Sequence, residues 1–239
     1  MTSLLRTAPG AYSSRPGRPV PRYRRDVQKL LDGIRDFHHR VRPAYRERFA
    51  HLALGQSPDC LFVACSDSRV VPNLFASTDP GDLFVLRNVG NVVPPHGAAN
   101  DADGSAGAAV EFATLSLQVR DIVVCGHSNC GAMRALATGE VPEGAANLRR
   151  WLANGAPSVR RLVAEPRLDP SLPEPDRLSQ AHVLEQLDHL RSYPAVAERV
   201  AAGELRLHAW WFDLTHAQVL AHNAPGGNFV PLVDLLERS

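Results

Sequence analysis

Three residues combine side-chain types and spacing that suit a metal ion: Cys65, His127 and Cys130. Two thiolates and one imidazole form a ligand set that zinc prefers. The His-x-x-Cys spacing lets His127 and Cys130 reach one ion from a single turn, while Cys65 joins them from a second segment. A structural zinc site is normally closed by four protein ligands, so a set of three leaves one position for water or hydroxide. The sequence therefore predicts a catalytic zinc site.

The two other cysteines are predicted to lie outside this site. Cys125 comes two residues before His127, at a position that we expect inside a buried strand. Cys60 comes five residues before Cys65, at the far end of an expected strand. Because a strand rises about 3.3 Å per residue, Cys60 is too distant to share the ion. We interpret both as ordinary buried or spare thiols.

A pair of opposite charges lies beside the first expected ligand. Asp67 and Arg69 follow Cys65 within the segment CSDSR. A guanidinium can hold a carboxylate ionised and in a fixed position through charge-assisted hydrogen bonds. Held in this way, Asp67 can accept the proton of a zinc-bound hydroxide and direct its lone pair at a substrate. The alternative is a turn with a surface ion pair, but the position next to Cys65 favours the catalytic role.

The elements that must position these residues have the pattern of an α/β fold. We expect strands at 61–64, 83–86 and 121–125 and a helix over 106–119. Continuously apolar strands that alternate with helices are typical of a mostly parallel central sheet flanked by helices. In such a sheet the loops after neighbouring strands meet in one crevice. Segments about 60 residues apart in sequence can therefore form a single site.

The N-terminal part is predicted to be irregular. Residues 1–22 are rich in proline and arginine, and we interpret them as a disordered or irregular arm. Residues 23–239 are predicted to form a single zinc-binding α/β catalytic domain. Helical periodicity begins near Asp26, and Pro43 is expected to end or kink that helix.

The C-terminal half is predicted to contain one long helix. The proline-rich stretch 156–175 is interpreted as a connection over the surface. A helix over 178–202, kinked at Pro194, and a strand at 205–212 are expected to follow. His182 and His189 of that helix, among the ten histidines, are interpreted as surface or satisfied core residues.

Composition narrows the class of protein. The chain has 239 residues, 44% hydrophobic and 21% charged, with a formal net charge of +1. These values are ordinary for a soluble globular protein and point to neither a nucleic acid nor a membrane as a partner. No apolar run reaches the length of a membrane span, and the start lacks the apolar core of a secretory signal. Four cysteines without a disulfide pattern suit a reducing compartment, so we expect the cytoplasm.

Together, three segments resemble the β-carbonic anhydrases. They are residues 65–69 (CSDSR), 87–91 (RNVGN) and 125–131 (CGHSNCG). The resemblance runs from about residue 26 to 212. It implies an α/β fold with a mostly parallel sheet, a homodimer or larger homo-oligomer, and reversible hydration of carbon dioxide to bicarbonate by zinc-hydroxide attack. Cys65, His127 and Cys130 would bind Zn²⁺, and Asp67 with Arg69 would form the catalytic dyad.

The same resemblance implies a substrate pocket. Its residues would be Gln56, Phe84, Val89, Phe112 and Gly131. Gln56 matches a glutamine that reaches the site of the neighbouring subunit, and Phe84 and Val89 match apolar walls around carbon dioxide. Phe112 stands where some members carry a tyrosine. The alternative for Phe84, Val89 and Phe112 is a plain role in the core.

Some bacterial members have an inhibitory bicarbonate pocket, and the resemblance bears on it here. The matching positions are Phe62, Arg87 and Phe212, of which only the arginine survives, so the pocket is not expected to form. We therefore expect the open branch of the family, in which Asp67 stays off the zinc. Asp67 as a conditional fourth ligand at low pH stays an alternative.

Other functions remain to be compared with carbon dioxide hydration. Hydrolysis of carbonyl sulfide or carbon disulfide uses similar metal chemistry, and the shape of the pocket decides between the substrates. A non-catalytic zinc-containing binding module would have no reason to place Asp67 and Arg69 beside an open coordination position. A thiol redox enzyme is disfavoured because the chain has no Cys-x-x-Cys motif.

Overall fold

The chain falls into two units, which are described separately. A computed structural model describes residues 27–98, 104–165 and 167–237. The first unit ends at His51 and the second extends from Leu52 to Ser239. The predicted arm at 1–22 lies outside the described residues. The predicted boundary between arm and catalytic domain stays a prediction.

The first unit is helical. It contains α1 (Gln28–Asp36), the π-helical turn η1 (Phe37–Val41) and α2 (Arg42–Leu52), whose last residue belongs to the second unit. Pro43 does not end the helix, because α1, η1 and α2 follow one another without a break, and the alternative of a kink stays a prediction. Pro43 is the second residue of α2, and the π-helical turn η1 lies directly before α2.

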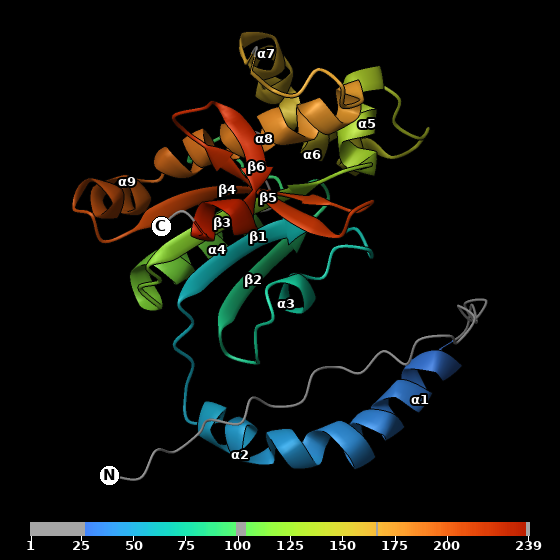
Figure 1. The fold of residues 1–239 in the computed structure, drawn as a ribbon, viewed down its shortest axis with the longest axis vertical. Helices are drawn as coiled ribbons and strands as arrows, with labels where there is room; N and C mark the ends of the chain where they lie inside the picture. The colour runs from blue at the N-terminus through green and yellow to red at the C-terminus, as the bar shows by residue number, and fades with distance from the viewer. Residues whose placement is uncertain (1–26, 99–103, 166, 238–239) are drawn as a thin grey trace. The chain divides into compact units, whose positions relative to one another are not determined.

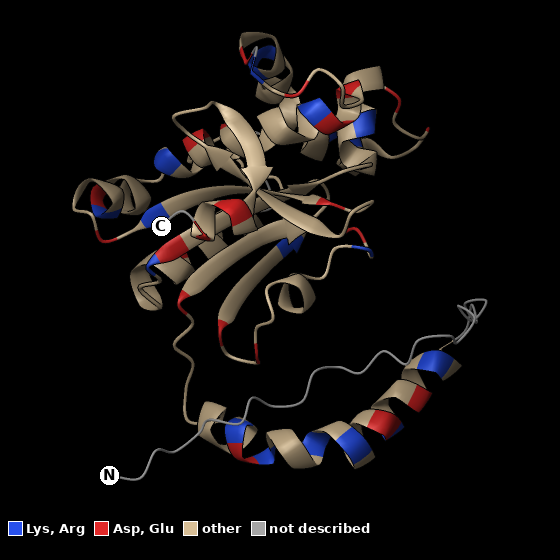
Figure 2. Ribbon diagram, viewed as in Figure 1, with Lys and Arg blue, Asp and Glu red and all other residues tan. Residues whose placement is uncertain are grey.

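Charged and apolar side chains both lie on the surface of this first unit. Figure 2 shows Lys and Arg interspersed with acidic residues along α1 and α2. The apolar residues recur at helical spacing but are exposed: Val27, Leu30, Leu31, Ile34 and Phe37. An apolar stripe on a helix is normally buried against another element. The described residues of this unit therefore leave an apolar face without cover.

The second unit is built on a six-stranded sheet in the order β2-β1-β3-β4-β5-β6 (Figure 1). The strands are β1 (Cys60–Cys65), β2 (Leu83–Asn88), β3 (Asp121–His127), β4 (Arg206–Asp213), β5 (Gln218–Asn223) and β6 (Asn228–Pro231). The first four pair in parallel, and β5 and β6 are antiparallel. The mostly parallel α/β fold and its first four strands are thus confirmed. The β5–β6 hairpin was not expected.

Alternating side chains of the central strands point to opposite faces and form two cores. Leu61 and Val63 of β1 belong to the larger cluster, and Phe62 and Ala64 belong to the other. The larger cluster is covered by α4 (Ser105–Glu111), the π-helical turn η2 (Phe112–Ser116), α8 (Glu174–Arg191) and α9 (Pro194–Ala201). The short α3 (Pro72–Phe75) contributes Phe75 to the other cluster.

The remaining helices follow β3 and β6 in the chain. They are α5 (Gly131–Thr138), α6 (Ala146–Leu152), the 3-10 turn η3 (Ala153–Gly155) and α7 (Ala156–Ala164), and α10 (Leu232–Leu236) follows β6. A third apolar cluster joins Cys65 and Cys130 to Met133 of α5 and Leu152 of α6. The helix over 106–119 is confirmed only to Ser116, as α4 and η2.

Two sequence predictions about the C-terminal half are wrong. Part of the expected surface connection is the helix α7, in which Pro157 lies at the helix start. The expected long helix is two helices, because the chain turns at Ser192 and Tyr193 before α9 begins with Pro194. Proline is favoured at the first position of a helix, since its missing N–H would have no partner there. Within the described residues, no helix is both long and apolar enough to cross a membrane.

Candidate metal centre

The strand register brings the two cysteine-bearing segments to one place. β1 and β3 are neighbouring parallel strands in which Ala64 lies opposite Cys125, so Cys65 and His127 stand at the same end of the sheet. After His127 the chain makes a turn through Asn129, whose φ is +54°. The Asn129 N–H donates to Asp176 Oδ1 at 2.7 Å, which fixes the turn to α8. Cys130 is then the N-cap of α5 and points back toward His127.

The three predicted ligands form one buried cluster. The sulfurs of Cys65 and Cys130 and a ring nitrogen of His127 lie within 4.8 Å of one another. The exposed fractions of these residues are 5%, 1% and 0%. Cys60 starts β1, at the opposite end of the strand, and Cys125 faces the core that contains Phe62. The structure thus separates the three candidate ligands from the two other thiols.

The hydrogen bonds of His127 define which ring nitrogen is available. Its Nδ1 lies 2.9 Å from the carbonyl oxygen of Ser128, which can only accept, so Nδ1 carries the proton. Nε2 is then an acceptor, and it is buried without a hydrogen-bond partner among the described residues. Metal-ligating histidines are oriented in this way by a bond from their other nitrogen. The donor set and this orphaned lone pair fit a zinc ion.

The pKa values of the two thiols shift in opposite directions. The hydrogen bond with Cys130 lowers the pKa of Cys65 to about 4, and the same interaction raises the pKa of Cys130. The backbone N–H of Gly90 also donates to Cys65 Sγ, at 3.4 Å. The site thus favours a thiolate at Cys65. A divalent cation bound there would neutralise the charge of both thiolates.

Asp67 faces this cluster in a fixed position. Arg69 donates from Nε to Oδ1 at 2.9 Å and from Nη2 to Oδ2 at 2.7 Å, and its backbone N–H also reaches Oδ1. These bonds hold the pKa of Asp67 well below its usual range. Oδ2 lies 4.0 Å from His127 Nε2. The predicted pair is therefore present in the structure, ionised and adjacent to the three candidate ligands.

Two arginines join the loops around the cluster. Arg69 Nη2 donates to the Asn129 carbonyl oxygen at 3.1 Å and so connects the loop after β1 to the loop after β3. Arg87 Nη2 donates to the carbonyl oxygens of Cys65, at 2.9 Å, and Asp67, at 2.8 Å. The sequence predicts for Arg87 only a place in the segment RNVGN and at a position that matches an inhibitory pocket. In this structure it fixes the backbone on both sides of Ser66.

Comparisons with known proteins agree with this geometry. A family model described as carbonic anhydrase matches residues 60–219. The carbonic anhydrase of Synechocystis sp. is 39% identical over 208 residues, which cover 85% of this chain and 74% of that protein. The carbonic anhydrase of Pseudomonas aeruginosa is 38% identical, with 87% and 93% covered. The chain belongs to the β-carbonic anhydrase family.

Solved structures of the family share the fold. The β-carbonic anhydrase CcaA superposes with a TM-score of 0.79 at 37% identity and covers 86% of this chain and 98% of its own. A tetrameric β-carbonic anhydrase from Sordaria macrospora superposes with a TM-score of 0.68 at 27% identity, with 81% and 95% covered. The family model and the named relatives support carbon dioxide hydration as the activity of this chain.

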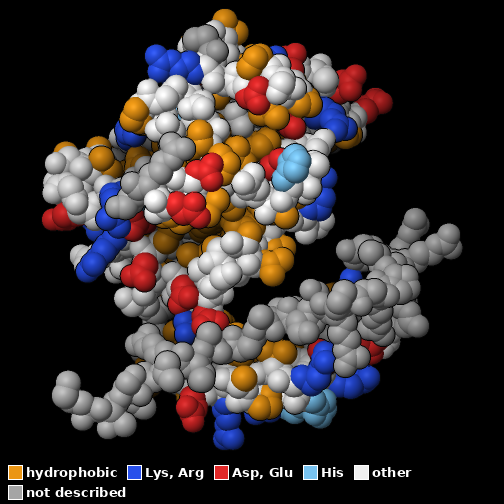
Figure 3. All heavy atoms as spheres, in the orientation of Figure 1, with side chains coloured by type: hydrophobic (Ala, Val, Ile, Leu, Met, Phe, Trp, Pro, Cys, Tyr) orange, Lys and Arg blue, Asp and Glu red, His pale blue; other side chains and the backbone are white. Residues whose placement is uncertain are grey.

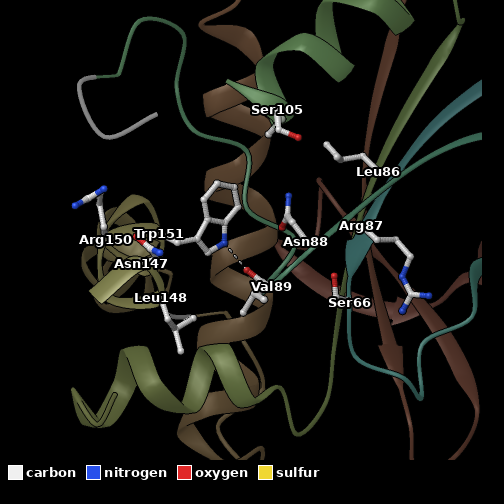
Figure 4. A pocket seen from close by; sticks show the side chains of 11 residues that line it. Ser66, Leu86, Arg87, Asn88, Val89, Ser105, Asn147, Leu148, Arg150 and Trp151 are labelled. Carbon is white, nitrogen blue, oxygen red and sulfur yellow. Dashed lines mark hydrogen bonds between the residues drawn. The ribbon is translucent and has the colours of Figure 1, made fainter. Parts of the chain in front are cut away.

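A cavity of about 610 Å³ adjoins the loops of the site (Figure 4). Ser66 and Val89 line it on the side of the sheet, and Leu148 and Trp151 of α6 line it on the other side. The Trp151 indole points at Val89, and its N–H donates to the Val89 carbonyl oxygen at 2.8 Å (Figure 4). Sequence reasoning did not identify Trp151, since nothing in the pattern LRRWL indicates a contact 62 residues away.

The expected pocket residues of a β-carbonic anhydrase fall into two groups. Val89 borders the cavity, and Gly131 begins α5 directly after the ligand Cys130. Phe84 pairs with Leu61, four residues before Cys65 along β1, and its ring packs on that of Phe112 at 5.7 Å. Gln56 precedes the start of β1 and is exposed. The chain brings Val89 and Gly131 to its own cluster, whereas Phe84, Phe112 and Gln56 lie toward the opposite end of β1 and β2.

Proposed function

We propose that the chain hydrates carbon dioxide reversibly at a zinc ion held by Cys65 Sγ, His127 Nε2 and Cys130 Sγ. The observation that carries this proposal is the cluster of three buried ligand atoms within 4.8 Å, with an ionised carboxylate beside it. Zinc held there supplies a Lewis acid that lowers the pKa of a water molecule toward neutrality. Membership of the family supports the reaction.

Asp67 is the proposed hydrogen-bond acceptor for the attacking oxygen. Its Oδ2 lies on the same side as His127 Nε2, and it stays ionised because the pKa of its carboxyl is depressed, first of all by the bonds from Arg69. An ionised carboxylate can only accept, so it would accept a hydrogen bond from the attacking oxygen and orient that oxygen with a lone pair free for carbon dioxide. Arg69 is a positioning residue that holds both carboxylate oxygens.

The substrate pocket is proposed to be shared between two copies of the chain. Val89 and Gly131 border the cluster of their own chain, while Gln56, Phe84 and Phe112 lie toward the opposite end of β1 and β2. A second copy can supply these three side chains. The exposed apolar stripe of α1 also needs a surface to cover it, and some of the hydrophobic side chains at the surface are visible in Figure 3. A tetrameric relative is consistent with a homo-oligomer.

The reducing cytoplasm is the proposed location. Two sulfurs of the site lie within 4.8 Å of each other, and all four cysteines are free thiols. A disulfide between Cys65 and Cys130 would remove two of the three metal ligands. The site is therefore best suited to a compartment that keeps thiols reduced.

The test of the metal-dependent reaction is stopped-flow hydration of carbon dioxide with zinc analysis of the same samples. We expect about one zinc per chain, loss of activity in chelator and recovery with added zinc. Cys65→Ser should lose the metal, and the matched control Cys60→Ser should keep both metal and activity. A protein that turns over carbon dioxide with the metal removed would contradict the proposal, and so would one that binds no zinc.

The shared pocket is tested by mixing two inactive variants. Gln56→Ala removes the side chain proposed to reach the second copy, and Asp67→Asn disables the chain's own site. A mixed dimer contains one site with Asp67 and a Gln56 from the other copy, so mixing should restore activity. Two Asp67→Asn samples mixed in the same way are the control. No recovery after subunit exchange has been verified by mass would contradict the shared pocket.

A further inference from the structure

A single peptide group connects the cavity wall to the metal centre. It is the peptide between Val89 and Gly90. Its carbonyl oxygen accepts the Trp151 indole N–H at 2.8 Å, and its N–H donates to Cys65 Sγ at 3.4 Å. Figure 4 shows the indole of Trp151 directed at this carbonyl from α6. One end of the peptide is thus held by a side chain, and its other end touches a metal ligand.

The following peptide, between Gly90 and Asn91, is held by a hydrogen bond from α8. His182 of α8 donates from Nε2 to the Gly90 carbonyl oxygen at 3.0 Å, because a carbonyl can only accept. Its Nδ1 then accepts from the Ser158 hydroxyl at 2.8 Å, and the ring is fully buried. Gly90 has φ +84°, and a Cβ there would lie 2.9 Å from the Cβ of Ala132. The backbone at Gly90 therefore has little freedom to turn its N–H away.

We propose that Trp151 is a positioning residue of the metal centre: through the Val89–Gly90 peptide it keeps the Gly90 N–H on the Cys65 sulfur. A hydrogen bond accepted by a peptide carbonyl strengthens the donor at the other end of the same peptide, because the group polarises as a unit. The Gly90 N–H then withdraws electron density from Cys65 Sγ. Hydrogen-bond partners of a metal ligand tune its electron donation and fix its orientation.

This proposal rests on the zinc binding proposed above and adds a role for a residue outside the ligand set. Trp151 packs against the apolar cluster that contains Cys65 and Cys130, and its N–H bonds to the Val89 carbonyl oxygen, so the proposed effect on the sulfur passes through the peptide. Removal of the Trp151 N–H should leave Cys65 less well positioned and so weaken zinc binding. It should also increase electron donation by the Cys65 sulfur. Neither effect exchanges a ligand. These two effects separate a positioning role from a role in packing alone.

The test replaces Trp151 by Phe, which keeps an aromatic ring and removes the N–H. The matched control is Trp210→Phe on β4, where the ring packs edge-on against Phe62 in the other core, with centroids 5.9 Å apart. Zinc affinity is measured by competition with a chromogenic chelator. We expect about tenfold weaker zinc binding for Trp151→Phe, at the lower end of the usual effect of such outer partners. Trp210→Phe should bind zinc as the unsubstituted chain does.

Two spectroscopic readouts address the peptide directly. With Co²⁺ in place of zinc, the sulfur-to-metal charge-transfer band should move to longer wavelength in Trp151→Phe, because a more electron-rich sulfur is easier to oxidise. With ¹¹³Cd in the unsubstituted chain, the Gly90 amide proton should show scalar coupling to the metal through Cys65 Sγ. The second readout needs no variant, so it decides the geometry even if Trp151→Phe fails to fold.

The outcomes distinguish this inference from the proposed function. If the unsubstituted chain binds no zinc, the proposed function fails. If it binds zinc but shows no coupling from ¹¹³Cd to the Gly90 amide, the positioning role of Trp151 is wrong. Equal zinc affinity and an unmoved cobalt band in folded Trp151→Phe would also overturn it, as would equal changes in Trp210→Phe.

Discussion

Arg69 holds both carboxylate oxygens of Asp67, with Nε at 2.9 Å from Oδ1 and Nη2 at 2.7 Å from Oδ2. This two-point contact fixes the plane of the carboxylate as well as its charge. The same Nη2 reaches the Asn129 carbonyl oxygen in the loop after β3. Because Cys65 precedes Asp67 and Cys130 follows Asn129, Arg69 also ties together the two loops that carry the candidate metal ligands.

Replacement of Asp67 by Asn should remove hydration activity while the metal stays bound. The amide has nearly the same shape, but it lacks the negative charge, and its NH₂ would meet the attacking oxygen as a donor. We expect kcat/KM to fall at least about 100-fold, the usual lower range for loss of an acid–base group. Stopped-flow assays with zinc analysis measure both quantities. Ser68→Ala, at the exposed position between the pair, is the control and should remain active; an active Asp67→Asn would contradict this role.

Replacement of Arg69 by Lys tests position separately from charge. Lysine keeps the positive charge but cannot make two parallel bonds to a carboxylate. We expect lower kcat with a nearly unchanged KM, because Arg69 orients Asp67 and is not placed to bind carbon dioxide itself. Arg134→Lys, on the exposed surface of α5, serves as the control. Full activity in Arg69→Lys would show that the charge alone is sufficient.

The cluster of candidate metal ligands could be predicted because two local facts sufficed. Cys65 and His127 each end an apolar run, and parallel strands bring such ends together regardless of the residues between them. Cys60 could be excluded for the same reason, since strand geometry fixes its distance from Cys65. These inferences need residue types, spacing and the rise of a strand, all of which the sequence contains.

The supporting residues could not be predicted in this way. Trp151 contacts Val89 across 62 residues, and His182 contacts Gly90 across 92. Such contacts depend on how α6 and α8 pack, and no local pattern marks them. Phe84 shows a related limit. The sequence could place Phe84 on β2, but it could not show that Phe84 pairs with Leu61, four residues before Cys65. The strands β5 and β6 could not be predicted either, because their short runs have mostly intermediate burial.

A methyl group at Gly90 should destabilise the chain more than the same change at Gly139. In Gly90→Ala the new Cβ would meet the Ala132 Cβ at 2.9 Å, and the residue must keep φ +84°. Crowding in a packed site costs about 1–3 kcal/mol, and the left-handed backbone adds about 1 kcal/mol. Gly139→Ala is the matched control, because φ is +73° there and nothing lies within 4 Å of the added atom. Chemical denaturation of the zinc-free proteins measures both; equal losses would contradict the predicted crowding.

His182 should make the fold less stable as the solution is acidified from neutral pH. Burial lowers the pKa of His182 to about 3, and repulsion from His189 on the same helix acts in the same direction. The ring faces the Gly90 carbonyl, the Ser158 hydroxyl and Gln186. In the unfolded chain the pKa is about 6.5, so below that pH the unfolded state binds a proton that the folded state does not take up. The stability contributed by neutral His182 is therefore present above about pH 6.5 and is lost as the pH falls toward 3.

The size of this effect follows from the same linkage. One unmatched proton changes the free energy of unfolding by at most about 1.4 kcal/mol per pH unit, which gives a loss of about 2 kcal/mol between pH 7 and pH 5. His182→Gln keeps an N–H for the Gly90 carbonyl but does not titrate, so its stability should fall less over this interval. Denaturation of zinc-free protein at each pH measures the difference, with exposed His51→Gln as the control. If His182→Gln loses stability as steeply as the unsubstituted chain, burial does not hold the His182 ring neutral, and the prediction is contradicted.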